Sequence, residues 1–339
     1  MKVAVGSTKY YEREYLNKFN TSSQQQLTFF DNSLTGHSTN LIIGFDAVCV
    51  LLTDKIDEAV IDKLSANNIK LIVLRSAGFD NVDIAAAAKR NIKVLRVPTY
   101  SPQAIAKHAA APILTLDRKT YKAYNRVKEN NFTLNNLIGF NLYEKTVGVV
   151  GTGKTGRAFC NIMFGFGCKV IAYDIKKSAA LVDKGIEYKS FYEFLNVSAI
   201  ISIHCPLTAE THHLFNSIAF AKMKAGTMLI NTSRGAIIKT SHAVEALKKQ
   251  QLGYLGIDVY EGEENLFFKD LSQTIVQDDL IERLMSFNNV LITPHQAFFT
   301  KKAVQQIAIT RINNLSDFEK RIPLENEVKI KKIKHLTTL

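Results

Sequence analysis

The chain has 339 residues, of which 46% are hydrophobic and 22% are charged, a composition typical of a globular protein and not of a disordered or fibrous one. This length exceeds what one core ordinarily uses, so two domains are expected. Lysine and arginine outnumber aspartate and glutamate by 43 to 31, but no basic stripe is interleaved with aromatic residues, so no nucleic-acid partner is expected. The excess charge favours solubility and attracts small anions.

Cysteine usage and the lengths of apolar runs indicate where the protein works. The four cysteines lie in apolar runs without Cys-x-x-Cys spacing, which favours reduced, buried thiols. Residues 1–5 begin directly as a strand and lack the apolar core of a signal peptide. No window approaches the ~20 apolar residues of a membrane-spanning helix, and no Cys/His cluster indicates a metal. We therefore expect a cytoplasmic protein without a metal or a membrane contact.

The first hundred residues alternate between strand and helix patterns. Strand patterns are found at 2–5, 26–30, 46–52, 70–74 and 93–97, and helix patterns at 10–20, 57–67 and 82–90. This alternation predicts a parallel sheet with helices on both faces. Residues 1–100 are thus expected to form most of an outer α/β domain.

A long helical pattern follows at 101–131. Ser101 is a suitable N-cap and Pro102 suits the first turn. Pro112 lies inside the pattern and predicts a kink or a break there, because proline removes a helix hydrogen bond. This segment is expected to bridge the outer domain and a second domain.

A glycine-rich turn at 151–156 follows an apolar strand pattern and dominates the second domain. Gly151 allows a tight turn, Gly153 lets backbone approach a pyrophosphate, and Gly156 lets the following helix pack on the strand. The helix N-terminus near Lys154 would face the phosphates. Asp174 ends the next strand pattern, where a carboxylate accepts hydrogen bonds from ribose hydroxyls and repels a 2′-phosphate. The pattern favours NAD over NADP.

The rest of the chain continues this second α/β domain and then leaves it. Strand patterns are found at 199–203, 227–231, 255–258 and 290–293, and helix patterns at 191–196, 218–223 and 241–249. A final helix at about 301–320 is expected to return to the outer domain. We predict a substrate domain of residues 1–100 plus 299–339 and an NAD-binding domain of residues 101–298.

Three polar side chains follow strands of the second domain, where ligands bind in open α/β sheets. They are Arg234, Glu263 and His295. Each alone is ordinary, since most such residues are surface charges. Together with a nucleotide motif they supply a cation for a substrate carboxylate, an acid/base, and a carboxylate to orient that base.

Several separate segments occur in the order of a known family: 75–83, 97–102, 148–156, 204–208, 230–236, 256–261 and 293–298. In them the chain resembles the D-isomer-specific 2-hydroxyacid dehydrogenases and, within that family, the NAD-dependent D-lactate branch. Relatives acting on phosphoglycerate or glycerate have a proline after the catalytic glutamate and a shorter path to the histidine. Here residues 265–270 follow Glu263, and a long insert leads to His295, as in the D-lactate branch.

The resemblance implies two doubly wound parallel-sheet domains, a flavodoxin-like outer domain and a Rossmann NAD-binding domain. It implies reversible hydride transfer between NAD and a small D-2-hydroxy acid, with pyruvate reduced to D-lactate in a homodimer or homotetramer. His295 would exchange the proton, Glu263 would hold its other ring nitrogen, and Arg234 would bind the substrate.

The resemblance also assigns the remaining contacts. Substrate would be held by the outer-domain residues Ala77, Gly78 and Tyr100 together with Arg234 and His295. NAD would be held by Gly151, Gly153, Lys154, Thr155, Gly156, Asp174, Cys205, Pro206, Thr211, Thr232, Ser233 and Asp258. The chain departs from the family at Thr155, where isoleucine is usual, at Lys107, where an acid is common, and at Thr211, where asparagine is common. NAD is expected to bind despite these three departures, because most of its contacts depend on backbone geometry.

Two other functions stay open on the sequence. One is a dehydrogenase of the same fold for a bulkier D-2-hydroxy acid. The other is an NAD-sensing protein without enzymatic activity, since transcriptional corepressors that resemble this family keep a similar site. The short C-terminal tail and the lack of a docking module argue against the second.

Overall fold

The computed structural model describes residues 1–21 and 25–329. The chain divides into two compact units, Met1–Tyr100 with Thr300–Leu339, and Ser101–Phe299. The predicted domains divide the chain one residue earlier, at 298. Residues 330–339 of the predicted outer domain lie outside the described part of the chain.

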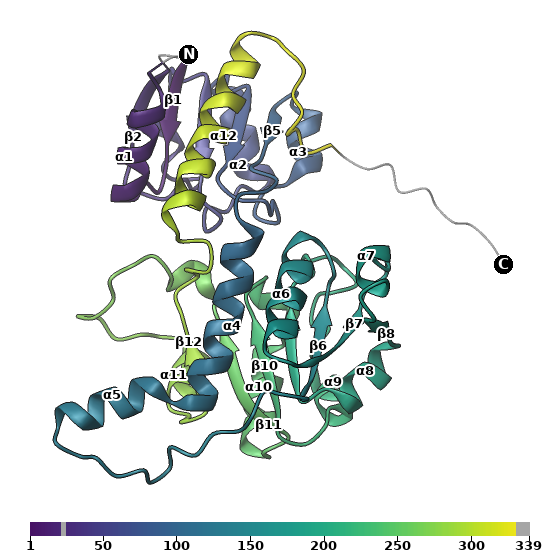
Figure 1. The fold of residues 1–339 in the computed structure, drawn as a ribbon. Coiled ribbons are helices and arrows are strands. Elements are labelled where there is room, and N and C mark those ends of the chain that lie inside the picture. The colour runs from purple at the N-terminus through teal and green to yellow at the C-terminus, as the bar shows by residue number, and fades with distance from the viewer. Residues whose placement is uncertain (22–24, 330–339) are drawn as a thin grey trace. The chain divides into compact units, whose positions relative to one another are not determined.

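The outer unit is built on a five-stranded sheet in which every neighbouring pair is parallel (Figure 1). The strand order is β2-β1-β3-β4-β5, the flavodoxin-like order, which confirms the predicted fold. The strands are β1 (Lys2–Val5), β2 (Gln26–Phe29), β3 (Ala47–Val50), β4 (Leu71–Leu74) and β5 (Lys93–Leu95). β3 and β4 are buried along their whole length, as expected of central strands covered on both faces.

Helices cover both faces of this sheet. α1 (Tyr10–Phe19) and α12 (Lys301–Glu319) pack together on one face, where Leu16 joins Ala308, Ile312 and Leu315 in a single core. The other face carries α2 (Glu58–Ala66), α3 (Ile84–Lys89) and the short 3-10 helix η1 (Thr39–Ile42). The predicted return of the last helix to the outer unit is therefore correct.

The second unit contains a seven-stranded sheet of parallel neighbours, ordered β12-β11-β10-β9-β6-β7-β8. Counted from β6, six of these strands follow the Rossmann order 3-2-1-4-5-6, and β12 adds a seventh. The order reverses between β6 and β9. The strands are β6 (Thr146–Val150), β7 (Lys169–Tyr173), β8 (Glu187–Tyr188), β9 (Ile200–Ile203), β10 (Thr227–Asn231), β11 (Leu252–Ile257) and β12 (Val290–Ile292).

Helices also sandwich the second sheet. One face is covered by α4 (Pro102–Arg118) and α6 (Lys154–Gly165), which pack on each other. The opposite face carries α8 (Phe191–Val197), α9 (Ser217–Lys222), α10 (Thr240–Lys248) and α11 (Asp279–Met285). Shorter elements are α7 (Ala179–Val182) and the 3-10 helices η2 (Gly235–Ile237) and η3 (Glu263–Asn265). The sequence patterns did not reveal α7, β8 or α11.

Of the kink or break predicted at Pro112, a break is wrong, because the helix is continuous there. Ser101 caps α4 by accepting a hydrogen bond from the Ala104 N–H, and α4 then runs through Pro112 to Arg118. Pro112 is buried, and a Cβ built on Gly256 would lie 3.0 Å from its ring, so the proline packs closely on β11. Tight packing offsets the hydrogen bond that proline cannot make. The helix ends instead at Arg118, and its C-cap Lys119 has the left-handed φ of 48°.

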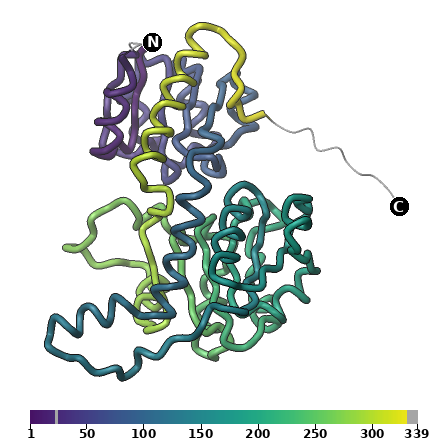
Figure 2. The backbone as a smooth tube through the Cα atoms, in the orientation of Figure 1, coloured from purple at the N-terminus to yellow at the C-terminus, as the bar shows by residue number. Residues whose placement is uncertain are grey.

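A short helix, α5 (Thr120–Lys128), begins directly after Lys119 and has no buried residue. Figures 1 and 2 show α5 and the segment after it projecting from the rest of the second unit. Large apolar side chains are exposed along this projecting segment, among them Phe132 (70%), Leu134 (81%) and Ile138 (84%). This exposure is unusual for side chains of this kind.

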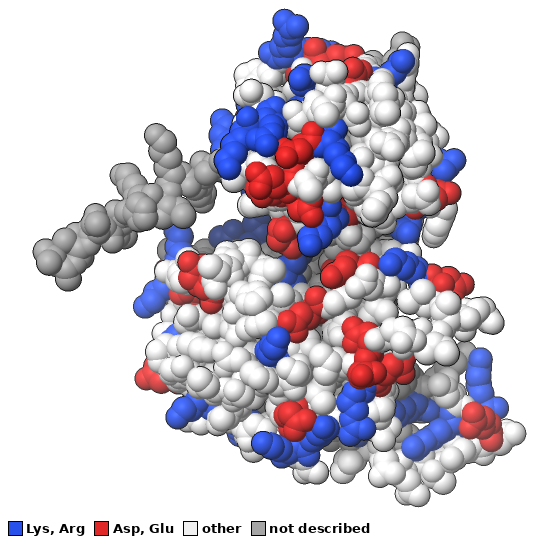
Figure 3. Space-filling model, turned by 180° about the vertical axis from the view of Figure 1, so that it is seen from behind, with Lys and Arg blue, Asp and Glu red and all other residues white. Residues whose placement is uncertain are grey.

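Surface charge, helix hydrophobicity and the cysteines can each be compared with the sequence analysis. On the face in Figure 3, acidic and basic side chains are interspersed. No helix among the described residues is long and apolar enough to cross a membrane. All four cysteines are free and buried, as predicted. Burial raises the pKa of the Cys160 and Cys205 thiols to about 12, so both are protonated at neutral pH.

Candidate active site

The glycine turn joins β6 to α6 at the point where the strand order reverses. Gly151 has a φ of +87°, and a Cβ on it would lie 2.6 Å from the Cys205 backbone nitrogen. A Cβ on Gly156 would lie 1.9 Å from the Gly151 carbonyl oxygen. Only glycine fits either position. Gly153 has open space at its Cβ and is the N-cap of α6, so the first N–H groups of this 12-residue helix are presented without a side-chain cap.

Asp174 directly follows β7, as predicted, and its carboxylate has a fixed orientation. Oδ2 accepts hydrogen bonds from the Thr152 N–H (2.6 Å) and hydroxyl (2.9 Å), and Oδ1 accepts one from the Lys176 N–H (2.9 Å). The Tyr188 hydroxyl in turn donates to Thr152 Oγ1 at 2.9 Å. The acid therefore lies beside the glycine turn with its charge held in place.

The loops after β9 and β10 lie next to each other beyond the same sheet edge. The Ser233 hydroxyl donates to the Cys205 carbonyl, and the Ser233 N–H donates to Asn231 Oδ1 at 3.0 Å. Thr232 is only 7% exposed, and its hydroxyl has no hydrogen-bond partner within the described part of the chain. An unpaired buried hydroxyl next to a glycine-lined cradle fits the recognition of a polar ligand. These residues therefore fit NAD.

His295 and Glu263 form a largely buried acid/base pair. Glu263 Oε1 lies 2.9 Å from His295 Nδ1, and Glu263 Oε2 accepts a hydrogen bond from the Tyr260 N–H at 3.0 Å. The two side chains are 12% and 10% exposed, so both are largely desolvated. A carboxylate at Nδ1 leaves Nε2 as the ring nitrogen that can exchange a proton with a substrate.

The loop that carries His295 is tied to a buried acid. Asp258 is fully buried, and its carboxylate accepts hydrogen bonds from the Thr293 hydroxyl (2.5 Å), the Gln296 N–H (2.9 Å) and the Ala297 N–H (2.8 Å). His108 of α4 lies 3.2 Å from both Asp258 Oδ1 and Thr293 Oγ1. Asp258 thus holds the His295 loop, and its predicted contact with NAD stays a prediction. The spacing of residues in the sequence predicts neither these hydrogen bonds nor the contacts of His108.

Arg234 lies in the turn after β10, just before η2. Its Nη1 donates to the Ser233 carbonyl at 2.8 Å, and the Asn231 side chain donates to the Arg234 carbonyl at 2.8 Å. A Cβ on Gly235 would lie 2.1 Å from the Tyr260 carbonyl carbon. The arginine turn is therefore in backbone contact with the segment that leads to Glu263.

Other predicted positions have clear local surroundings. Lys154 and Thr155 begin α6, and the Thr211 hydroxyl donates to the exposed Pro206 carbonyl at 2.7 Å. His204 is half-buried, and loss of solvent around its ring lowers its pKa to about 3, so it is neutral at neutral pH.

Ala77, Gly78 and Tyr100 belong to the outer unit. Ser76 donates from its hydroxyl to the Gly78 carbonyl at 2.7 Å, and Arg96 donates to the Ala77 carbonyl at 2.9 Å. The turn after β4 is therefore ordered by side-chain contacts. Its part in substrate binding stays a prediction.

A parallel sheet in Rossmann order with a glycine turn at its reversal, an acid after the next strand and a buried His–Glu pair defines a dinucleotide-dependent oxidoreductase. Residues 110–297 match the family model for the D-isomer specific 2-hydroxyacid dehydrogenase, NAD binding domain. The chain belongs to this family of NAD-dependent dehydrogenases.

Known proteins are similar over nearly the whole length. The D-lactate dehydrogenase of Escherichia coli is 46% identical over 97% of this chain and 100% of its own. Its apo-structure has a TM-score of 0.87 at 44% identity, with the same coverage of 97% and 100%. The pyruvate reductase of Chlamydomonas reinhardtii has a TM-score of 0.88 at 40% identity, over 96% and 98%. The D-lactate dehydrogenase of Aquifex aeolicus, solved with NAD and lactic acid, has a TM-score of 0.85 at 32% identity, over 94% and 96%.

Proposed function

We propose that this protein reduces pyruvate to D-lactate with NADH, reversibly. The observation that carries the proposal is the Glu263–His295 pair at 2.9 Å, in a unit that belongs to the family's NAD-binding domain. Support for pyruvate comes from the similar proteins, which are a D-lactate dehydrogenase and a pyruvate reductase.

The proposed steps follow from the chemistry of each side chain. When bound, NADH supplies the hydride for the substrate carbonyl carbon. His295 donates the proton at Nε2 to the carbonyl oxygen, while Glu263 holds Nδ1 and stabilises the imidazolium before transfer. Arg234 pairs with the carboxylate or polarises the carbonyl through a guanidinium that stays charged. Backbone N–H groups at Ala77 and Gly78 bind the carboxylate.

The experiment is an NADH-oxidation assay across a panel of 2-oxo acids. Pyruvate is expected to give the highest kcat/KM, followed by branched and aromatic analogues, with D-lactate as the product. NADPH is expected to be a poor substitute, because the Asp174 carboxylate repels a 2′-phosphate. A preference for a branched or aromatic acid would assign the bulkier substrate instead, and no activity on any member would refute the enzymatic proposal.

We further propose that the protein is a cytoplasmic homodimer or homotetramer. The buried, free thiols suit a reducing compartment. The apolar side chains exposed on the projecting segment suit contact with a second copy.

Light scattering is expected to give a multiple of the 37.9 kDa chain mass. The double change Leu134→Glu and Ile138→Glu should lower that mass, because charge would be buried against an apolar surface. An unchanged mass in the double variant would place the interface elsewhere.

A further inference from the structure

The segment that follows Glu263 has no part in the steps above, although the sequence singles it out as an insert. Its start is fixed by Glu263 itself, whose carbonyl accepts hydrogen bonds from the Leu266 N–H (3.1 Å) and the Phe267 N–H (2.8 Å). Phe267 is 9% exposed and belongs to the core beneath, and Leu266 packs against the same core. The position of the next residue, Phe268, is therefore determined by anchored neighbours.

Phe268 has a φ of 62°, in the left-handed region that bulky residues rarely adopt. Such a conformation persists only where the surroundings hold it, and it is found most often at functional sites. The side chain is half-buried against the core and does not point into open solvent. The unusual backbone directs an aromatic ring to one defined place.

The ring of Phe268 lies beside the imidazole of His295. The ring centroids of Phe268 and His295 are 6.0 Å apart with an interplanar angle of 36°. Phe298 meets the same imidazole edge-on, with centroids 6.5 Å apart and an angle of 72°. His295 as a whole is only 8% exposed. Two aromatic rings thus lie beside the imidazole whose Nδ1 pairs with Glu263.

We propose that Phe268 is a positioning residue for proton transfer by His295, and this proposal rests on the proposed role of His295. A hydrogen bond at Nδ1 alone leaves the imidazole free to tilt about that bond, because the terminal torsion of histidine is broad. The Phe268 ring restricts this tilt and keeps Nε2 aimed at the substrate oxygen. It also excludes water that would compete with the substrate for Nε2.

The test compares Phe268→Gly with Phe268→Ala and Phe268→Leu. Glycine removes the ring and relieves the strain of the positive φ, which offsets part of the apolar burial lost with the ring. Both Gly and Ala variants should lose about 10- to 100-fold in kcat, the scale expected when a reacting group is misplaced. The Kd for NADH should be unchanged. Leucine keeps an apolar cover and should retain most of the activity.

The matched control is Phe166→Ala at the far end of α6, where the side chain is 39% exposed. It should keep full activity. If Phe268→Gly restores parental kcat while Phe268→Ala does not, the defect of the alanine variant comes from backbone strain, and the ring has no positioning role. Parental kcat in both variants would refute the proposal in the same way.

A second readout does not depend on turnover. Diethyl pyrocarbonate modification of the peptide carrying His295, followed by mass spectrometry, should be faster in the Gly and Ala variants than in the parent, and unchanged in Phe166→Ala. If the parent reduced no 2-oxo acid, the proposed function would fail, while this rate would still decide whether Phe268 covers His295. Equal rates in parent and Gly variant would overturn the proposal.

Discussion

His295→Ala is expected to lower kcat for pyruvate reduction by about 10²–10⁴-fold, the usual contribution of a positioned general acid. The alanine removes the proton donor, and no other titratable side chain is paired with Glu263 in the described hydrogen bonds. NADH binding should persist, because the glycine turn and Asp174 are formed without His295. Stopped-flow kinetics at saturating pyruvate and a separate NADH titration measure the two effects.

His212→Ala is the matched control, because His212 is exposed and should leave kcat unchanged. Glu263→Gln should have a smaller effect than His295→Ala, since the amide still bonds to the imidazole but no longer stabilises its charged form. An alanine variant with nearly parental kcat would show that the proton comes from elsewhere.

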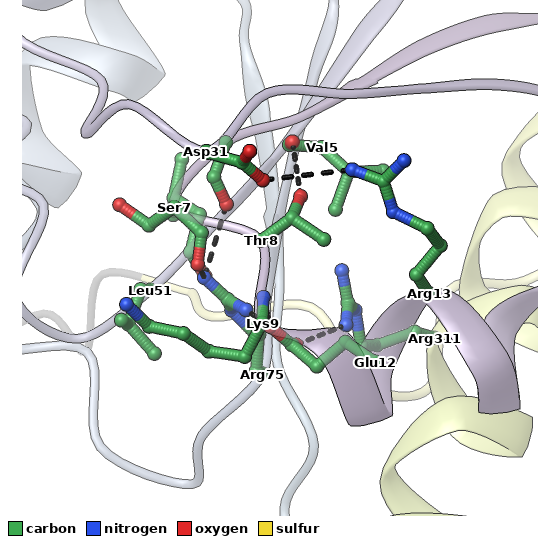
Figure 4. A network of polar contacts seen from close by, with 12 residues as sticks. Val5, Ser7, Thr8, Lys9, Glu12, Arg13, Asp31, Leu51, Arg75 and Arg311 are labelled. Carbon is green, nitrogen blue, oxygen red and sulfur yellow. Dashed lines mark hydrogen bonds and ion pairs between the residues drawn. The ribbon is translucent and has the colours of Figure 1, made fainter. Parts of the chain in front are cut away.

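The second large effect is expected on stability, at a buried cluster of three charged side chains in the outer unit (Figure 4). Glu12 of α1 pairs with Arg75 through Oε2 and with Arg311 of α12 through Oε1, the latter at 2.9 Å. All three side chains are 6% exposed or less. Arg75 also donates from Nη2 to the Gly6 and Ser7 carbonyls at 3.0 Å. Burial, together with the charge of Arg311, holds the pKa of Arg75 well below its usual value.

Glu12→Gln is expected to lower the free energy of unfolding by about 3–5 kcal/mol, because it leaves two buried guanidinium groups without a counter-charge. Arg311→Met should be neutral or stabilising. It removes one excess charge whose Nε and Nη2 have no hydrogen-bond partner among the described residues, and it leaves the Glu12–Arg75 pair intact. Urea unfolding measures both.

The double variant Glu12→Gln with Arg311→Met separates charge balance from shape. It should recover part of the loss, since a single buried cation is left in place of two. A double variant no more stable than Glu12→Gln alone would mean that repulsion between the two arginines is not the cause.

Much of the fold was predictable because its signals are local. Alternating apolar patterns identify buried strands, and the spacing of Gly151, Gly153 and Gly156 with Asp174 identifies a Rossmann turn without further context. The two-residue strand β8 and the short helices α7 and α11 carry too few residues for a periodic pattern. The continuity of α4 through Pro112 depends on a glycine 144 positions later, Gly256, and no local signal contains such a contact.

The active site, too, was predictable from the sequence only in part. Arg234, Glu263 and His295 each follow a strand, and their sequence positions show it. The contacts among Asp258, Thr293 and His108 join three segments that are distant in the sequence. Only the folded sheet brings these residues together. Phe268 was visible as part of an insert, but its left-handed backbone depends on the anchoring of Leu266 and Phe267, which the sequence does not state.

The outer unit is made from two ends of the chain, and this affects how the protein can be synthesised. The NAD-binding unit is one continuous stretch and is complete once Phe299 has left the ribosome. The outer sheet, although translated first, lacks α12, which buries Ala308, Ile312 and Leu315 against β1, β3 and β4. Until the last helix is made, Val3, Val5 and Val73 have an incomplete cover. The outer unit therefore begins to be translated first but finishes folding last, and it needs protection from aggregation for longest.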